Sequence, residues 1–144
     1  QMLAVAAPNR GVLHHVIRAP EVYLVPRTDG RILIGSTLEE AGYDKRTTTE
    51  TIHQLHRAAL ALVPELNHAR MLEDWAGLRP GTPDGLPILG ATSTPGYYVA
   101  TGHFRDGILL TPVTAHLMAE VICSGNTDHD IAPFSPARFV VKAA

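Results

Sequence analysis

The chain has 144 residues, about the length of one domain, and its 45% hydrophobic and 18% charged residues are typical of a globular protein. A formal net charge of -2, without a Lys/Arg cluster, excludes the electrostatic signature of a nucleic-acid-binding protein. The single cysteine, Cys123, excludes an internal disulfide, and no apolar run reaches about 18 residues, so we expect a cytoplasmic protein without a membrane span or signal peptide.

Short apolar runs near the start of the chain predict an antiparallel sheet. Runs rich in β-branched residues occupy positions 2–6, 12–17, 22–25 and 31–34. Thr28-Asp29-Gly30 lies between the last two runs and has the composition of a hairpin turn, in which Gly30 takes a positive φ. Parallel pairing would need crossovers of about a dozen residues, and these gaps are too short for that.

A helix is predicted to follow the strands. Thr47 and Glu50 have the spacing of a capping box. Apolar residues then recur at helical spacing, at Ile52, Leu55, Ala59 and Leu62. Pro64 ends the pattern, because proline cannot continue a helix. This amphipathic helix should lie across one face of the sheet.

Glycine and proline shape the second half of the chain. They exclude a regular helix over 80–90, and a strand is expected at 97–100. Thr111-Pro112 has the pattern of an N-cap and first helical position, although the helix could begin nearer Gly107. Its residues are mostly apolar, which predicts a buried helix, and Ser124-Gly125 should end it. Residues 126–144 are expected to form a polar, Pro-containing tail.

Several segments carry a family resemblance. Residues 75–80 read Trp-Ala-Gly-Leu-Arg-Pro, residues 82–90 read Thr-Pro-Asp-Gly-Leu-Pro-Ile-Leu-Gly, and residues 102–110 read Gly-His-Phe-Arg-Asp-Gly-Ile-Leu-Leu. Together with residues 22–37, they resemble the C-terminal part of the FAD-dependent amino-acid oxidases. Within that superfamily, the glycine oxidases of thiamine biosynthesis are the most similar. The resemblance covers most of residues 1–125.

The resemblance implies an α+β fold, a mainly antiparallel sheet with a covering helix, followed by a strand–loop–helix that belongs to an FAD-binding domain in the family. It divides the chain into a substrate-domain segment (1–78), a return segment of the FAD-binding domain (79–125) and a tail (126–144). The Gly-x-Gly-x-x-Gly turn that holds the FAD pyrophosphate is absent from the sequence. We therefore expect a longer parent protein whose N-terminal FAD-binding half is the missing partner of this chain.

The expected substrate site is built around Arg79. In the family, the arginine of the Gly-Leu-Arg-Pro motif binds the substrate carboxylate, a task for which a planar guanidinium offers two parallel donors. The resemblance places Tyr23 on the same carboxylate. It also places Arg105 near the pocket, where this arginine either orients the substrate or forms an ion pair that ties the loop to the fold.

The expected FAD contacts lie in the glycine loop that precedes the last helix and at the start of that helix. The open N-terminus of a helix attracts negative charge, because its first N–H groups lack partners. The family commonly has Asn where Asp106 stands, so we expect its carboxylate to point away from the flavin or to pair with a neighbour. His103 is expected to be a packed, hydrogen-bonded residue. The residues assigned to FAD are Gly102, His103, Arg105, Asp106, Gly107, Ile108 and Leu109.

The resemblance implies a parent enzyme that oxidises glycine or a similar small amino acid to a 2-oxo acid, ammonia or an amine, and hydrogen peroxide. Orientation and electrostatics would replace a side-chain base, and this chain alone should be inactive. The alternatives are a non-catalytic module that binds carboxylates or partners, and an FAD-dependent amine dehydrogenase or tRNA-modifying oxidase of the same fold. The eight histidines complete no recognisable metal site. Apolar surface exposed by the missing half would favour a homo-oligomer.

Overall fold

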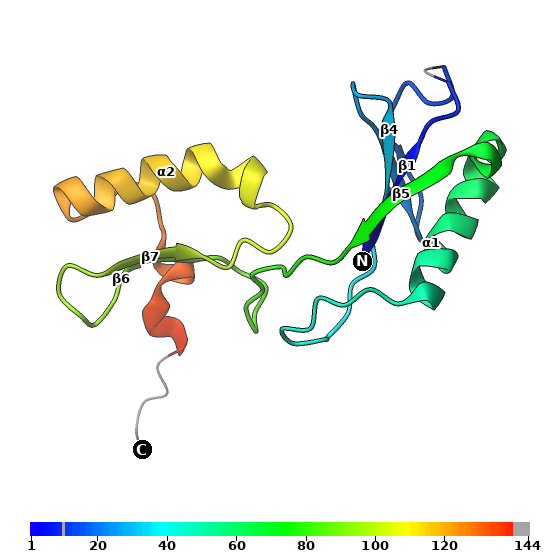
Figure 1. Ribbon diagram of the computed structural model, residues 1–144. Helices are drawn as coiled ribbons and strands as arrows, with labels where there is room; N and C mark the ends of the chain where they lie inside the picture. The colour runs from blue at the N-terminus through cyan, green and yellow to red at the C-terminus, as the bar shows by residue number, and fades with distance from the viewer. Residues whose placement is uncertain (10, 140–144) are drawn as a thin grey trace. The chain divides into compact units, whose positions relative to one another are not determined.

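A computed structural model describes residues 1–9 and 11–139, and it divides the chain into two units. The first unit is Gln1–Leu78, and the second begins at Arg79 (Figure 1). The strand pairs are antiparallel throughout the described residues. This arrangement, with a helix in each unit, confirms the predicted α+β class.

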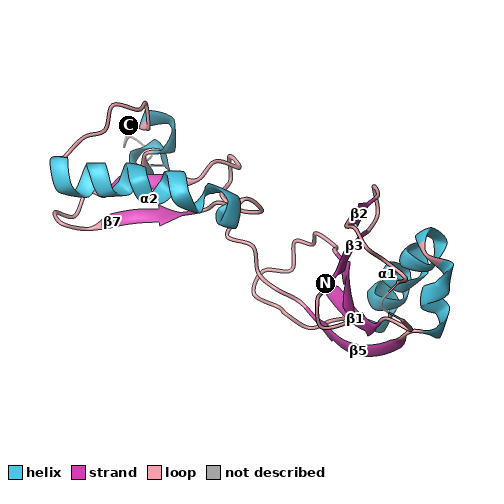
Figure 2. Cartoon of the chain, turned by 90° about the horizontal axis from the view of Figure 1, so that it is seen from above, coloured by secondary structure: helices cyan, strands magenta, loops and turns pink. Residues whose placement is uncertain are grey.

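The first unit contains a sheet in the order β2-β3-β4-β1-β5 (Figures 1 and 2). The hairpin between β3 and β4 turns at Gly30, whose φ of 87° confirms the predicted turn residue. β5 was not predicted, and it pairs with β1 at the edge of the sheet. The bounds are β1 Met2–Ala6, β2 Ile17–Arg18, β3 Tyr23–Pro26, β4 Arg31–Gly35 and β5 Arg70–Trp75.

The strand predicted at 12–17 is wrong over most of its length. Only Ile17–Arg18 forms β2, which pairs with the first half of β3. Continued pairing would bring residue 15 opposite Pro26, which has no N–H to donate. Residues 11 and 12 instead belong to a turn, in which the Val12 N–H donates to the Asn9 carbonyl over 3.5 Å.

Helix α1, Thr49–Leu62, packs on the sheet as predicted. Alternate strand residues such as Leu3, Leu24 and Ile34 are fully buried in the core beneath it. The apolar face of the helix contributes Ile52, Leu55 and Ala59 to the same core. Leu62 is 40% exposed and does not belong to it. A 3-10 helix, η1 (Pro64–His68), follows and buries Leu66.

The cap of α1 differs from the prediction by one residue. Thr48 is the N-cap, and its side-chain oxygen accepts a hydrogen bond from the Thr51 N–H. The Thr47 hydroxyl donates to the Asp74 carboxylate of β5 instead. Glu50 accepts from Gln54 and does not reach back to the cap, so no capping box forms. A partner from a distant strand therefore overrides the local pattern.

The second unit is a β-hairpin with helical elements on both faces (Figure 1). Helix α2 packs on β6 and β7, while the 3-10 helices η2 and η3 contact β6. The residues between 80 and 87 contain no helix, as predicted, and the predicted strand is shifted by one residue. The bounds are β6 Ile88–Ala91, β7 Tyr98–Thr101, α2 Gly107–Ser124, η2 Ala132–Phe134 and η3 Pro136–Phe139.

Helix α2 begins at Gly107 with Asp106 as its N-cap, so Thr111 is not the cap and Pro112 lies inside the helix. The Thr111 hydroxyl donates to the Gly107 carbonyl over 2.7 Å, within the first turn. The end of the helix is as predicted. Gly125 takes a left-handed φ of 80°, and its N–H donates to the Val121 carbonyl over 3.1 Å.

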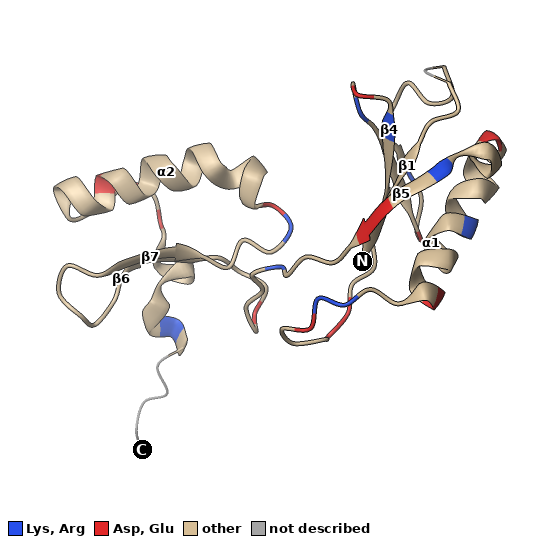
Figure 3. Cartoon of the chain, in the orientation of Figure 1, with Lys and Arg blue, Asp and Glu red and all other residues tan. Residues whose placement is uncertain are grey.

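The prediction that α2 is buried is wrong. Leu117, Met118 and Val121 are its buried residues, whereas Ile108 is 94% and Leu109 is 78% exposed. The hairpin covers one side of the helix, and the other side lacks a covering element among the described residues. Figure 3 shows how few charges α2 carries, since Glu120 is its only residue among Asp, Glu, Lys and Arg.

By length and composition, α2 is apolar enough to cross a membrane, although no such segment was expected from the sequence. It is the only helix in the described part of the chain that meets this test. Length and composition alone are weak evidence for a span, because helices from the cores of soluble proteins pass the same test.

The tail is ordered over its described part, where Arg138 anchors it to the segment before β6. The Arg138 guanidinium donates to the Asp84 carboxylate over 2.6 and 3.1 Å and to the Leu86 carbonyl over 2.9 Å. It also donates to the Phe134 carbonyl over 2.8 Å, which closes the 3-10 turns on each other. Residues 140–144 of the predicted tail lie outside the described residues.

Candidate functional site

Arg79 lies beside the glycine loop at 102–107 within the second unit. Its guanidinium carbon is 6.0 Å from the centre of the Phe104 ring, which is within the range of a cation–π contact. The backbone joins the same segments, because the Phe104 N–H donates to the Pro80 carbonyl over 3.1 Å. The structure therefore brings together two segments that the sequence singled out separately, and Phe104 is a contact that the sequence did not indicate.

The shape of the loop requires glycine at position 102. Gly102 is buried with a φ of 78°, and an added Cβ would lie 2.6 Å from the Thr82 Cγ2 atom. Thr82 has little room to move, because its hydroxyl donates to the Leu86 carbonyl over 2.8 Å. Phe104 also has a positive φ, of 52°, which is uncommon for a residue other than glycine. Two left-handed residues thus turn the chain sharply between β7 and α2.

His103 faces the helix that follows the loop. Its ring is half-buried, and its Nε2 atom is 2.9 Å from the Thr114 hydroxyl oxygen, about two turns into α2. This contact ties the loop to the helix. It fixes the distance between the loop and the first turn of α2, where the helix N–H groups are exposed.

The N-terminus of α2 has open hydrogen-bond donors. The Asp106 side chain makes no capping hydrogen bond, and its N–H is used in a turn with the His103 carbonyl over 3.0 Å. Within residues 1–9 and 11–139, the N–H groups of Gly107, Ile108 and Leu109 have no acceptor. Open donors beside exposed apolar side chains fit the polar edge of a flat, electron-accepting ring such as that of FAD.

The charged side chains of the loop point to solvent. Arg105 and Asp106 are both exposed, and neither makes an ion pair within the described residues. The described residues therefore do not form the ion pair that the sequence left open for Arg105. Of the two expectations for the Asp106 carboxylate, orientation away from the flavin stays a prediction, and the described residues provide no ion-pair partner for it. The carboxylate does not cap α2.

Tyr23 belongs to the first unit, on the face of the sheet opposite α1. It is half-buried, and its hydroxyl donates to the Met2 sulfur over 3.6 Å. Tyr23 stands directly across from Gly35 on β4. Because Tyr23 and Arg79 lie in different units, their meeting on one substrate carboxylate remains a prediction.

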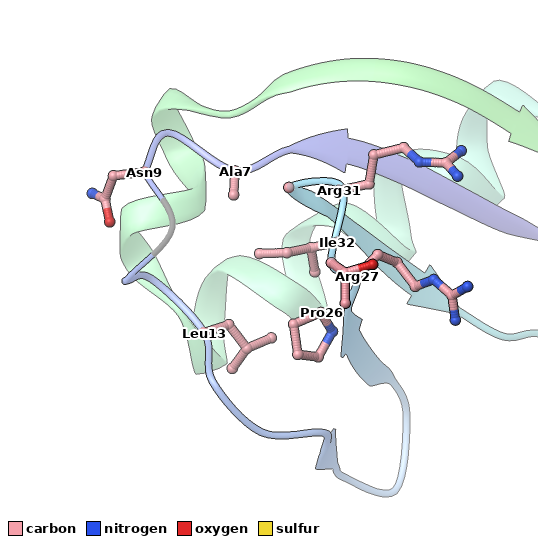
Figure 4. A pocket seen from close by; sticks show the side chains of 9 residues that line it. Ala7, Asn9, Leu13, Pro26, Arg27, Arg31 and Ile32 are labelled. Carbon is pink, nitrogen blue, oxygen red and sulfur yellow. The ribbon is translucent and has the colours of Figure 1, made fainter.

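A cavity of about 200 Å³ in the first unit lies at the hairpin end of β3 and β4, away from Tyr23 (Figure 4). Apolar groups line it, among them Leu13, Pro26 and Ile32, while the side chains of Arg27 and Arg31 point away. Arg31 is engaged with the carboxylates of Asp29 and Glu73 over 2.8 and 3.0 Å. Neither Tyr23 nor Arg79 lines this cavity. In the described part of the chain, no cluster of three or more His, Cys, Asp or Glu could hold a metal ion.

The fold, the arginine and the glycine loop point to one class of protein. Residues 1–121 match the FAD dependent oxidoreductase (DAO) family, and the chain belongs to that family. This confirms the resemblance that the motifs carried.

Within the family, the similar proteins include glycine oxidases and a hydrogen cyanide synthase subunit. The glycine oxidase of Pseudomonas putida is 40% identical over 125 residues, which are 86% of this chain and 34% of the relative. The hydrogen cyanide synthase subunit HcnC of Pseudomonas aeruginosa is 42% identical over 134 residues, 92% of this chain and 32% of the relative. The crystal structure of glycine oxidase from Geobacillus kaustophilus matches with a TM-score of 0.86 and 37% identity, covering 97% of this chain and 38% of that one. The chain thus spans about a third of the length of the curated relatives it matches.

Proposed function

We propose that this chain is the substrate-binding part of a cytoplasmic, flavin-dependent oxidase of glycine or a similarly small amino acid. The observation that carries the proposal is Arg79, held against Phe104 beside the uncapped N-terminus of α2. A glycine oxidase relative of 40% identity supports the choice of substrate. The parent protein supplies the N-terminal FAD-binding half, and this chain alone is inactive.

Arg79 binds the substrate carboxylate through two parallel N–H donors. A hydrogen bond to a charged group contributes about 1.5–3 kcal/mol net, so this contact accounts for much of the affinity for a ligand as small as glycine. Tyr23 donates its hydroxyl proton to the same carboxylate and fixes the rotation of the substrate. Arg105, exposed at the loop, orients the substrate from the solvent side. With the substrate carboxylate fixed, the Cα–H bond is held in one orientation towards the cofactor side of the site. Such orientation of the reacting bond accelerates the reaction.

The loop and the first turn of α2 form the cofactor side of the site. The residues that would hold FAD are Gly102, His103, Arg105, Asp106, Gly107, Ile108 and Leu109. FAD, when bound, supplies the acceptor for the two electrons and the hydrogen that leave the substrate Cα. The open N–H groups of Gly107, Ile108 and Leu109 stabilise negative charge that develops beside them. No side chain has to remove a proton if the amine enters in its neutral form.

The test is turnover by the full-length parent protein. With glycine and dioxygen, we expect a flavin spectrum and equal amounts of glyoxylate, ammonia and hydrogen peroxide. Reduction of the flavin by glycine without peroxide would indicate a dehydrogenase instead. A protein that binds glycine but contains no flavin would be the non-catalytic carboxylate-binding module, and the proposal would be wrong.

A second candidate follows from the HcnC relative, which covers 92% of this chain. In that case the same carboxylate site would serve an enzyme that converts its substrate to hydrogen cyanide. The two candidates differ in product and share the roles of Arg79 and Tyr23. Measuring cyanide alongside glyoxylate in the same reaction separates them.

A further inference from the structure

A row of four residues crosses the open face of the sheet in the first unit. Tyr23 on β3 is opposite Gly35 on β4, Gly35 is opposite Met2 on β1, and Met2 is opposite Trp75 on β5. The residues next to them, Leu3, Leu24 and Ile34, are fully buried in the core under α1. Since side chains alternate along a strand, the row lies on the face opposite α1. Met2, Tyr23 and Trp75 are all half-buried there.

The Tyr23 ring reaches across Gly35 to Met2. The Tyr23 hydroxyl is 3.6 Å from the Met2 sulfur. A Cβ atom at position 35 would lie 2.9 Å from the Met2 Cγ and Cε atoms and 3.1 Å from the Tyr23 hydroxyl oxygen. These contacts are too close for an added methyl group unless both side chains shift. Gly35 thus provides the space in which the hydroxyl and the thioether meet.

A thioether is a weak hydrogen-bond acceptor. The Met2 sulfur can fix the direction of the Tyr23 hydroxyl. A carboxylate replaces it readily as the acceptor of this hydrogen bond, since charged acceptors form stronger hydrogen bonds. A carbonyl or carboxylate in its place would compete with the substrate for the single hydroxyl proton. Among the described residues, Met2 is the only partner of that hydroxyl.

We propose that Met2 is a positioning residue. It holds the Tyr23 hydroxyl over Gly35 until that hydroxyl donates its hydrogen bond to the substrate carboxylate instead. This inference rests on the proposed contact between Tyr23 and the substrate. It adds a residue from β1, where neither the motifs nor the family resemblance indicated a function.

The test is a double-mutant cycle in the full-length parent protein, with glycine KM and kcat as readouts. Met2→Leu conserves volume and removes the acceptor, so we expect KM to rise about two- to fivefold with kcat unchanged. Met2→Gln introduces a stronger acceptor, and we expect a larger rise of about tenfold. Both effects should disappear in the Tyr23→Phe background, which has no hydroxyl to position. Met71→Leu on β5 is the matched control, and its KM should be unchanged.

Three outcomes would overturn the inference. If Tyr23→Phe raises KM but the Met2 effects persist in that background, Met2 acts by packing, and the proposed function stands. If Met2→Leu leaves KM unchanged, the sulfur has no positioning role. If Tyr23→Phe itself leaves KM unchanged, the contact between Tyr23 and the carboxylate is wrong. Gly35→Ala is a second test, since its methyl group displaces both the Tyr23 hydroxyl and the Met2 side chain, and it should raise KM as well. An unchanged KM for Gly35→Ala would contradict the inference.

Discussion

Arg79 is the residue whose chemistry is least replaceable. Lysine keeps the positive charge but lacks the planar fork that binds both carboxylate oxygens and stacks on an aromatic ring such as Phe104. We predict that Arg79→Lys in the full-length parent raises the glycine KM by at least about tenfold. Arg57→Lys, at an exposed position of α1, is the matched control and should not change KM. An unchanged KM for Arg79→Lys would remove the central contact of the proposed site.

Comparing Gly102 with Gly85 separates two costs of adding a side chain, the cost of a left-handed backbone conformation and the cost of a steric clash. Both have a left-handed φ, of 78° and 73°, but only at Gly102 would a Cβ meet other atoms, with Thr82 Cγ2 at 2.6 Å. Alanine at either position costs about 1–2 kcal/mol for its backbone conformation. We predict that Gly102→Ala lowers the free energy of unfolding by about 1–3 kcal/mol more than Gly85→Ala, measured by denaturant titration. Equal losses would mean that Thr82 yields easily.

His56 on α1 should titrate below the usual range. Burial lowers its pKa from 6.5, and the charge of His53, one turn earlier, lowers it further. As the pH falls, the unfolded chain therefore binds this proton first, so the stability of the first unit decreases below about pH 6.5. We predict that His53→Gln raises the pKa of His56 part of the way back, which an NMR titration would show. A pKa of His56 that does not respond would mean that burial acts alone.

Among the elements, the tail depends on one ion pair. Hydrogen bonds from Arg138 hold the pKa of Asp84 well below its usual 3.8. The stabilisation is thus fully present above about pH 4 and is lost as the pH falls towards the lowered pKa. We predict that Arg138→Gln lowers the protection of residues 132–139 against hydrogen exchange, relative to the intrinsic rate at the same pH, and that acid lowers this protection in the unchanged protein. Exchange that is equally slow in the variant would show that η2 and η3 pack on β6 without the pair.

The elements that sequence could predict are those fixed by local patterns. The β3–β4 hairpin follows from Gly30, and α1 follows from apolar residues at helical spacing. β5 could not be predicted, because its exposed residues, such as Glu73, resemble a loop and its partner β1 lies far away in the chain. The burial of α2 was predicted wrongly, since its apolar composition says nothing about which elements are present to cover it.

The candidate site divides in the same way. Arg79 and the glycine loop could be predicted because they belong to the sequence motifs that resemble the family. The structure places them together within one unit. Phe104, Thr82 and Met2 were missed, because their contacts depend on loop geometry and strand register. No spacing in the sequence encodes the contact between Met2 and Tyr23, which are on strands separated by β4 in the sheet.

At the scale of the whole molecule, the proposed function requires the N-terminal FAD-binding half of a longer parent protein. The exposed apolar residues of α2 and the open donors at its N-terminus support the proposal that further protein and FAD lie beside this helix. The proposed substrate contacts, Tyr23 and Arg79, come from two units of a chain that spans about a third of its curated relatives. The central claim is therefore that Tyr23 and Arg79 meet on one small carboxylate.

A crystal structure of the full-length parent protein with bound glycolate, the hydroxyl analogue of glycine, tests this claim most directly. We predict that the glycolate carboxylate accepts hydrogen bonds of about 3 Å from the Arg79 guanidinium and from the Tyr23 hydroxyl, beside the first turn of α2. Glycolate bound elsewhere, or contacted by one of these side chains without the other, would contradict it.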